Sequence, residues 1–490
     1  MDKFSKIQLL YKKIITNKIF HFIGSRYVTY FLQFVNSLLI AVNLGLYYLG
    51  IWGFIMLVTQ YLNQSNFGIS HSVNAIISIN KRREWYVQKV IGTSLTMLGI
   101  LSLVMIVLFI INELCNFNFG SKYNFSTYAP FVIIIGVLGY FNTLFSNIFR
   151  VYGRLYEIAF NQTIFPILTL FSVIIFRKEN LLWALIIANT IAFLSSFIMY
   201  LLRCPIKLKM LFIWKLIIKI QIKGWYLFIY SLSFYLIVIS TRSFVSAYYG
   251  VEEFGSFTFS FSLANSILLL LQAISFLIFP KLLNRFAISS EKETFDILTS
   301  VRDTYIVVSH GLIHFAIMLF PCLLLFLPQY QNTANVFNMI ALSIVLYTNC
   351  FGYQGFLIAK GKERKLSVLS LFSLIINIVI ALVLIKIFKV PFYQVIFSTL
   401  ISYIIYMFLI GYNGRKALGA SLKFKDVIRD VFPLRIFIPF SLSVCICLFE
   451  LNVYYGMIPF VVFICFNIGV LGKVYTVLKR IVNEPKFINI

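Results

Sequence analysis

The sequence is poor in acidic residues and in charge of any kind. Only 12% of its 490 residues are charged, and Asp and Glu number 16 against 42 Lys and Arg. No polar stretch is long enough to form a soluble domain, and 60% of the residues are hydrophobic. One or two soluble cores could not bury that much apolar surface. The scarcity of charge therefore excludes an ordinary soluble protein and indicates a lipid environment.

Cysteine and histidine are also scarce, with seven Cys and four His. No pair of cysteines has metal-ligand spacing with a histidine nearby, and only Cys115 falls in an expected outer loop. His310 and His314 are one helical turn apart, but no third ligand lies near them in the sequence. We predict no disulfide framework, no metal site and no cofactor.

The dominant feature of the sequence is a succession of apolar runs that continues to the C-terminal region. Runs of about 18 residues or more are typical of membrane-spanning helices. The thirteenth of these runs, near residues 436–451, is short and is predicted to tilt little or to be re-entrant. The sequence predicts an all-α integral membrane protein with about fourteen spans, near residues 22–43, 51–77, 87–112, 128–148, 156–176, 181–202, 225–248, 256–280, 304–328, 335–359, 366–388, 395–413, 436–451 and 457–472.

The basic residues predict the orientation of these spans. Lys and Arg concentrate on alternate connections, and the opposite connections carry only Lys122, Arg177, Lys178, Lys386 and Lys389. Because positive charge accumulates on the cytoplasmic side, both termini are expected to be cytoplasmic. The net charge of +26 then sets topology and attracts anionic lipid headgroups, and no nucleic-acid partner is expected.

A short motif occurs twice and predicts the domain organisation. Gly45 to Gly50 and Gly250 to Gly255 each lie between two apolar runs, 205 residues apart. This distance corresponds to about six spans, so the pattern predicts two parallel six-helix lobes with a cavity between them. In chain order we expect an amphipathic N-terminus on the inner surface (1–21), an N-lobe (22–202), a basic amphipathic linker (203–224), a C-lobe (225–413), and two further helices with a tail (414–490).

The second span is unusually polar. Its polar side chains fall on one stripe of a continuous helix, and Asn265 in the second lobe follows Gln60 by the same 205 residues. Such a polar face must contact protein or a water-filled cavity. Hydrogen bonding between helices is one interpretation. We favour a cavity wall that binds sugar hydroxyls, formed by Gln60, Asn63, Gln64, His71, Asn74 and Asn265.

Two arginines fall within spans that correspond under the repeat, Arg26 in the first and Arg242 in the seventh. A cation in a bilayer is costly, and a planar guanidinium suits phosphate oxygens. The alternative is that both side chains extend to the nearest membrane surface. We predict that they bind an anionic substrate.

The absence of certain residues weakens two other functions. No Asp or Glu lies deep in any predicted span, which disfavours a cation-coupled multidrug antiporter. The outer loops are short and every Asp is expected on the inner side, which disfavours a membrane polysaccharide polymerase. No catalytic residue is expected.

The segment Tyr47 to Phe54, running into Asn66-Phe67-Gly68-Ile69, resembles the start of the second helix in Wzx-type O-antigen and polysaccharide flippases. Gly250 to Phe257 resembles the second-half copy of that segment. These flippases belong to the multidrug/oligosaccharidyl-lipid/polysaccharide exporter superfamily. The chain differs from many members at Thr241-Arg242, where they carry an acidic residue, which puts carboxylate-based ion coupling in doubt.

The resemblance implies two six-helix lobes plus two C-terminal helices in the bacterial cytoplasmic membrane. It implies export of an undecaprenyl-pyrophosphate-linked oligosaccharide by alternating access, through a cationic cavity to which Arg26 and Arg242 could contribute. Polysaccharide polymerase and glycosyltransferases are implied as partners. A peptidoglycan lipid precursor is an alternative cargo.

Overall fold

The computed structural model describes residues 18–80, 82–115, 117, 119–288 and 290–483. Most of the amphipathic N-terminus predicted at 1–21 lies outside this range. Helices and short 3₁₀ turns make up the regular structure of the described residues. The chain divides into two compact units, unit 1 (Met1–Phe228) and unit 2 (Ile229–Ile490).

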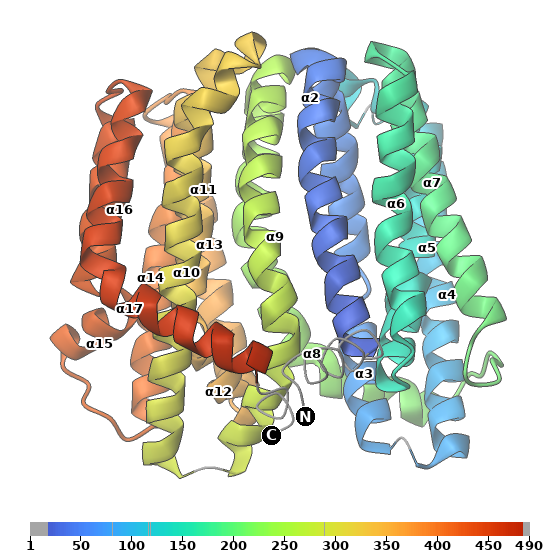
Figure 1. The fold of residues 1–490 in the computed structure, drawn as a ribbon. Helices are drawn as coiled ribbons and strands as arrows, with labels where there is room; N and C mark the ends of the chain where they lie inside the picture. Colours follow the sequence, from blue (N-terminus) through green and yellow to red (C-terminus); the bar gives the residue numbers. More distant parts are fainter. Residues whose placement is uncertain (1–17, 81, 116, 118, 289, 484–490) are drawn as a thin grey trace, which may run out of the picture. The chain divides into compact units, whose positions relative to one another are not determined.

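Unit 1 begins with a helix that folds back on itself. Helix α2 (Lys18–Gln64) has 47 residues and is interrupted at Gly45, whose φ of 72° and ψ of 173° are not helical. A straight helix of this length would measure roughly 70 Å, whereas the hydrocarbon core is about 30 Å thick. Because a left-handed φ favours glycine, Gly45 allows α2 to form two legs (Figure 1).

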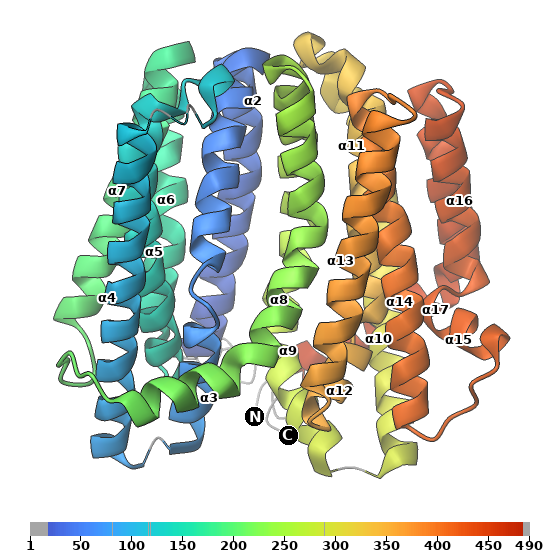
Figure 2. The ribbon, with the colours of Figure 1, turned by 180° about the vertical axis from the view of Figure 1, so that it is seen from behind.

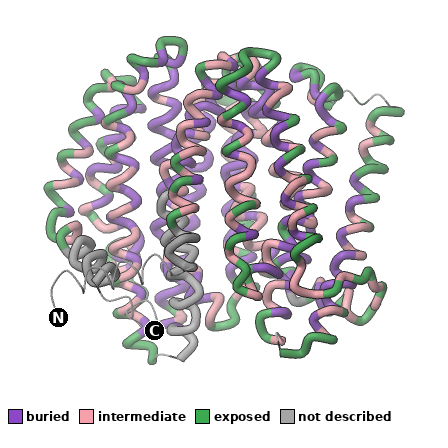
Figure 3. Tube along the Cα trace, turned by 45° about the vertical axis from the view of Figure 1, so that its right-hand side comes forward, coloured by how far each residue is buried: buried purple, intermediate pink, exposed green. Residues whose placement is uncertain are grey.

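The rest of unit 1 packs around these two legs. Helix α6 contacts α2 along its length, and α5 and α7 complete the bundle. Buried and exposed residues alternate along the helices (Figure 3). The remaining helices are α3 (Ile69–Asn80), α4 (Glu84–Leu114), α5 (Phe125–Val151), α6 (Leu155–Ile175) and α7 (Lys178–Leu202).

Unit 2 contains the longer series of helices. Helix α8 begins in unit 1 and ends in unit 2. The helices are α8 (Trp214–Tyr248), α9 (Val251–Ile288), α10 (Glu291–Leu325), α11 (Ala334–Val345), α12 (Tyr353–Ala359), α13 (Glu363–Lys386), α14 (Phe397–Ala417), α15 (Phe424–Val431), α16 (Leu434–Leu448) and α17 (Met457–Asn483).

The exposed surfaces of several helices are those of a membrane protein. Helix α13 has a mean hydropathy of 3.0, yet Val368, Phe372 and Ile375 on it are at least half exposed. Large apolar side chains in such numbers are stable outside the core only in lipid. Among the described residues, eleven helices are long and apolar enough to span a membrane, or up to twelve with one bent pair. Since α2 has two legs, this agrees with the predicted all-α membrane fold of about fourteen spans.

The repeated glycine motif occupies corresponding turns. Gly45 forms the turn within α2, and Gly250 lies between α8 and α9, where Glu253 Oε2 accepts a 2.6 Å hydrogen bond from its backbone N–H. Each copy of the motif therefore connects two long helical segments. Gly45 connects the two legs of α2, and Gly250 connects α8 to α9. The division into two six-helix lobes, which the motif predicts, stays a prediction.

Two predicted spans are not continuous helices. The second, expected over 51–77, breaks at 65–68, where Phe67 and Gly68 have φ of 48° and 78°. The tenth, expected over 335–359, passes through a 3₁₀ turn at Leu346–Cys350 and a non-helical Gly352 with φ of 91°. Hydropathy alone measures the length and polarity of an apolar run, so it does not detect interruptions of the helix within that run.

The predicted linker packs closely on unit 1. The backbone N–H of Leu211 donates to the carbonyl of Gly92 on α4 over 3.2 Å, and Thr96 donates to the carbonyl of Leu211 over 2.9 Å. A Cβ at Gly92 would lie only 2.2 Å from the carbonyl oxygen of Lys209. The first turns of α8 follow, crossing the lower ends of α3 and α4 in the view of Figure 2. The segment 203–224 is thus attached to unit 1 by backbone contacts.

The thirteenth span, predicted to be short or re-entrant, is a bent pair. Helices α15 and α16 meet at 71°. Asp430 at the end of α15 is 8% exposed and pairs with Arg415 of α14, while Arg302 of α10 lies 3.6 Å away. The hydroxyl of Tyr353 on α12 donates to the same carboxylate over 2.7 Å. The carboxylate of Asp430 therefore links α15 to α10, α12 and α14.

A second ion pair fixes the far side of the bend. Arg435 in the first turn of α16 donates to Asp303 on α10 over 3.0 Å, and Asp303 also lies 3.6 Å from Arg302. Arg302 is 1% exposed and stacks over Tyr353 at 5.1 Å. Because isolated buried charges are costly, this network specifies where the bent pair docks.

We predict that Asp430→Asn destabilises unit 2 strongly. The substitution leaves Arg302 and Arg415 buried without their shared carboxylate, a change that costs about 3–5 kcal/mol in comparable networks. Thermal unfolding of the purified protein should show a marked fall in Tm. The matched control is Asp296→Asn on the exposed face of α10, which should leave Tm unchanged. Equal Tm values for the two variants would contradict the proposed anchoring.

Candidate functional site

Arg26 lies near the start of α2 and is partly exposed. Its Nε donates a 3.1 Å hydrogen bond to Oε1 of Gln162 on α6. Nearly three turns further along α2, Asn36 donates to the carbonyl of Pro166 over 2.7 Å. These two bonds attach the first leg of α2 to α6 and set the position of the guanidinium group.

Arg150 brings a second cation to the same part of unit 1. It lies in the last turn of α5, is exposed, and donates to Oδ1 of Asn147. Asn147 in turn donates to the carbonyl of Ser70 on α3 over 3.2 Å. The next residue, His71, is exposed and lies within electrostatic range of Arg150, as Arg26 does. We call Arg26, Arg150 and His71 the unit 1 basic cluster.

The predicted polar stripe forms two separate groups. Gln60, Asn63 and Gln64 lie on the second leg of α2, whereas His71 and Asn74 lie on α3 beyond the break. All are exposed or partly exposed. The break removes the common helical register on which the prediction of one continuous stripe depended, so that part of the prediction is wrong.

Asn63 has a structural contact on α5. Its Oδ1 is buried beside Gly139, where a Cβ would lie 2.1 Å away. Glycine at this position is therefore needed for the close approach of α2 and α5. For Asn63, packing between helices accounts for the polar side chain at least as well as binding does.

Arg242 has a different environment in unit 2. It is 2% exposed, and its guanidinium carbon lies 4.4 Å from the ring centroid of Phe261 and 5.9 Å from that of Phe254 on α9. Asn265 is one turn beyond Phe261 and partly exposed. Arg242 is thus stacked on aromatic rings, while Arg26 remains accessible.

Beside Arg242, Thr241 is part of a neutral seam. Thr241 Oγ1 lies 2.7 Å from Thr399 Oγ1 and 3.2 Å from Ser398 Oγ. Asn377 Nδ2 donates to the carbonyl of Ile237 and to Ser240 Oγ, both over 2.8 Å. Uncharged hydrogen bonds therefore join α8, α13 and α14 here.

The paired histidines bind different partners. His310 Nε2 lies 2.9 Å from Asn349 Oδ1, and His314 Nδ1 lies 3.2 Å from Ser443 Oγ. Within the described part of the chain, no group of three or more His, Cys, Asp or Glu could hold a metal ion. The contacts of both histidines are therefore hydrogen bonds to residues of other segments.

The structure adds residues that the sequence interpretation missed. Arg150, Asn147 and Gln162 join Arg26 and His71, although the sequence places Arg150 at the edge of a connection. The signal that the sequence offered was the pair Asn147 and Arg150, an asparagine and an arginine one helical turn apart at the end of a span. Their role depended on α5 ending beside α3, which no local pattern reveals.

The helical fold, together with the buried polar contacts within unit 1 and within unit 2, defines a multi-pass helical membrane protein. Its arrangement is similar to that of solved transporters. An inward-facing multidrug resistance MATE family transporter of the MOP superfamily superposes with a TM-score of 0.65 at 13% identity, covering 80% of this chain and 94% of that one. The lipid II flippase MurJ, in an inward closed conformation, gives 0.62 at 13% identity, covering 94% and 99%.

A third solved structure, a complex of the MATE multidrug transporter DinF-BH, gives a TM-score of 0.56 at 17% identity, covering 84% and 97%. Comparison with curated protein sequences found no match. The family described as polysaccharide biosynthesis protein matches residues 15–286, more than half of the chain. The chain belongs to this family and has the fold of the MOP superfamily, as its sequence motifs suggested.

We predict that Arg242→Gln lowers stability because the stacking of a desolvated cation on aromatic rings is worth about 2 kcal/mol. Arg242→Lys should lie between wild type and Arg242→Gln. Thermal unfolding measures the effect, with the exposed Arg429→Gln of unit 2 as control. An Arg242→Gln variant as stable as the control would show that the stacking contributes nothing.

Proposed function

We propose that this protein moves an undecaprenyl-pyrophosphate-linked oligosaccharide, the repeat unit of a surface polysaccharide, from the inner to the outer leaflet by alternating access. The observation that carries the proposal is the unit 1 basic cluster. It brings together Arg26 of α2, Arg150 of α5 and His71 of α3, and the amides of Gln162 on α6 and Asn147 on α5 accept hydrogen bonds from the two arginines. Membership of the polysaccharide biosynthesis protein family supports the same substrate class.

The cluster suits a pyrophosphate headgroup. Arg26 and Arg150 lie close enough to interact electrostatically, so they repel each other, and an anion between them would relieve that repulsion. Guanidinium groups form short, charge-assisted hydrogen bonds to phosphate oxygens. The partly exposed amides of Gln60, Gln64 and Asn74 offer both donors and acceptors to sugar hydroxyls.

The physical task is to remove a solvation barrier. A charged pyrophosphate and a polar sugar chain cannot cross hydrocarbon unaided. A protein needs only to replace their water by fixed cations and amides while the lipid tail stays in the bilayer. No covalent bond forms or breaks, so the proposed function requires no catalytic residue and no enzyme activity.

In this proposal Arg242, Asn265 and Asn63 contribute on the substrate path as well as in packing. The membrane is the bacterial cytoplasmic membrane with both termini inside, as the distribution of Lys and Arg favours. Polysaccharide polymerase and glycosyltransferases would then supply and consume the lipid-linked unit.

A peptidoglycan lipid precursor is the second candidate cargo. It shares the polyprenyl-pyrophosphate chemistry, and the lipid II flippase MurJ shares the fold over 94% of this chain. The same cationic cluster would bind either headgroup. The sugar part of the trapped lipid distinguishes the two.

Deletion of the gene is expected to trap the cargo on the cytoplasmic leaflet. Lipid extraction and mass spectrometry should detect accumulated undecaprenyl-linked repeat units, and a complementing copy should clear them. Accumulation of a peptidoglycan precursor instead would support the second cargo. Normal levels of both lipids, combined with reduced export of cationic dyes, would replace the proposal by drug export.

Arg26→Gln and Arg150→Gln should each reproduce the trapping. A hydrogen bond to a charged group contributes about 1.5–3 kcal/mol, so export should fall roughly 10- to 100-fold per substitution. Arg82→Gln and Arg83→Gln, exposed between α3 and α4 of the same unit, are the matched controls and should export normally. Each variant's amount in the membrane is measured in parallel. Normal export by Arg26→Gln at wild-type levels would disprove the headgroup role.

A further inference from the structure

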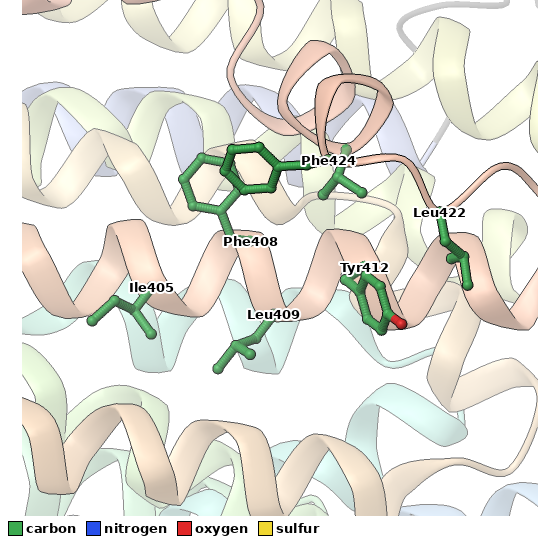
Figure 4. A pocket seen from close by; sticks show the side chains of 7 residues that line it. Ile405, Phe408, Leu409, Tyr412, Leu422 and Phe424 are labelled. Atoms are coloured by element: carbon green, nitrogen blue, oxygen red, sulfur yellow. The ribbon is translucent and has the colours of Figure 1, made fainter.

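An apolar groove opens on the surface of unit 2 beside α15, the helix that carries Asp430. It has a volume of about 420 Å³ and is lined by α14, the connection after it and α15 (Figure 4). Ile405, Leu409 and Tyr412 follow one another at helical spacing along α14, and the rings of Phe408 and Phe424 stack at 6.0 Å. Phe424 is 72% exposed and Tyr412 42%. These side chains form a wall with no covering segment among the described residues.

One end of the groove is basic. Lys416 lies one turn beyond Tyr412 on the same stripe of α14, and Lys423 lies between the lining residues Leu422 and Phe424. Both are exposed. Lys416 is also within electrostatic range of Lys365 at the start of α13.

The carboxylate that follows Lys423 on α15, that of Asp426, is already engaged. Asp426 accepts a 2.6 Å hydrogen bond from Ser421 Oγ and lies among Arg415, Lys423 and Arg429. Arg415 is paired with Asp430, but Lys416, Lys423 and Arg429 together still outnumber Asp426, so the end of the groove remains positive. Apolar walls that lead into a cluster of lysines complement a molecule with an apolar chain and an anionic head.

We propose that this groove binds an anionic phospholipid, with one acyl chain against α14 and α15 and its phosphate at Lys416 and Lys423. The wall from Ile405 to Tyr412 rises roughly 10 Å along the helix. This length fits within one leaflet of about 15 Å and suits a single acyl chain. A long polyprenyl chain would extend far beyond it. Basic pockets between membrane helices are known to hold anionic headgroups.

The test uses purified full-length protein and two lipids with the same chains, dioleoyl-phosphatidylglycerol and dioleoyl-phosphatidylcholine. Native mass spectrometry measures the apparent affinity of each lipid. The wild type should prefer phosphatidylglycerol. Lys416→Gln with Lys423→Gln should weaken its binding at least about tenfold, since each lysine near a lipid surface contributes roughly fivefold. Lys386→Gln with Lys389→Gln, at the opposite end of α13, is the matched control and should bind normally.

A second variant tests the apolar wall separately. Leu409→Trp narrows the groove without changing charge, and it should weaken binding of both lipids. If the double lysine variant folds poorly, Lys416→Gln alone is measured, with about a fivefold effect expected. Equal affinity of the wild type for the two lipids would overturn the proposal. So would displacement of phosphatidylglycerol by equimolar undecaprenyl phosphate, which would identify a substrate tail as the occupant.

Discussion

Hydrocarbon offers no hydrogen bonds, so each polar group within a span must find its partner in protein or in water. This constraint governs the polar contacts within the spans. In unit 2, Thr241 is within hydrogen-bond distance of both Asn377 and Thr399 where three helices meet. In unit 1, Arg26 is held by Gln162, which attaches α2 to α6. Polar residues therefore specify which helices are neighbours, while apolar residues on the outer faces require only lipid.

Two groups of arginines have contrasting environments. Arg302, Arg415 and Arg435 bind the carboxylates of Asp303 and Asp430. These residues hold a bent pair of helices in place, and their charges are balanced within the fold. Arg26 and Arg150 are instead positioned by the neutral amides of Gln162 and Asn147, and both remain accessible. An amide, unlike a carboxylate, positions a guanidinium without itself adding a countercharge.

Part of the candidate site could be predicted and part could not. Arg26 was identified because a cation within a long apolar run is rare in any sequence. His71 belongs to a polar series in the sequence, although the break at 65–68 divides that series between two helices. Arg150 was assigned to a connection, since nothing local shows that α5 ends beside α3. The burial of Arg242 on Phe261 also depends on the packing of α8 against α9, which hydropathy does not describe.

The sequence by itself determined the class of protein, the approximate number of spans, the equivalence of Gly45 and Gly250, and the flippase-like motifs. These properties depend on run length, composition and short patterns, all of which are local along the chain. Only the tertiary structure decided where helices break, at 65–68, at Gly352 and between α15 and α16. It also decided which arginines pair with carboxylates, which stack on aromatic rings and which bond to amides. Both outcomes depend on residues distant in sequence that meet only when the helices pack, because the cost of a buried charge is set by its neighbours in space.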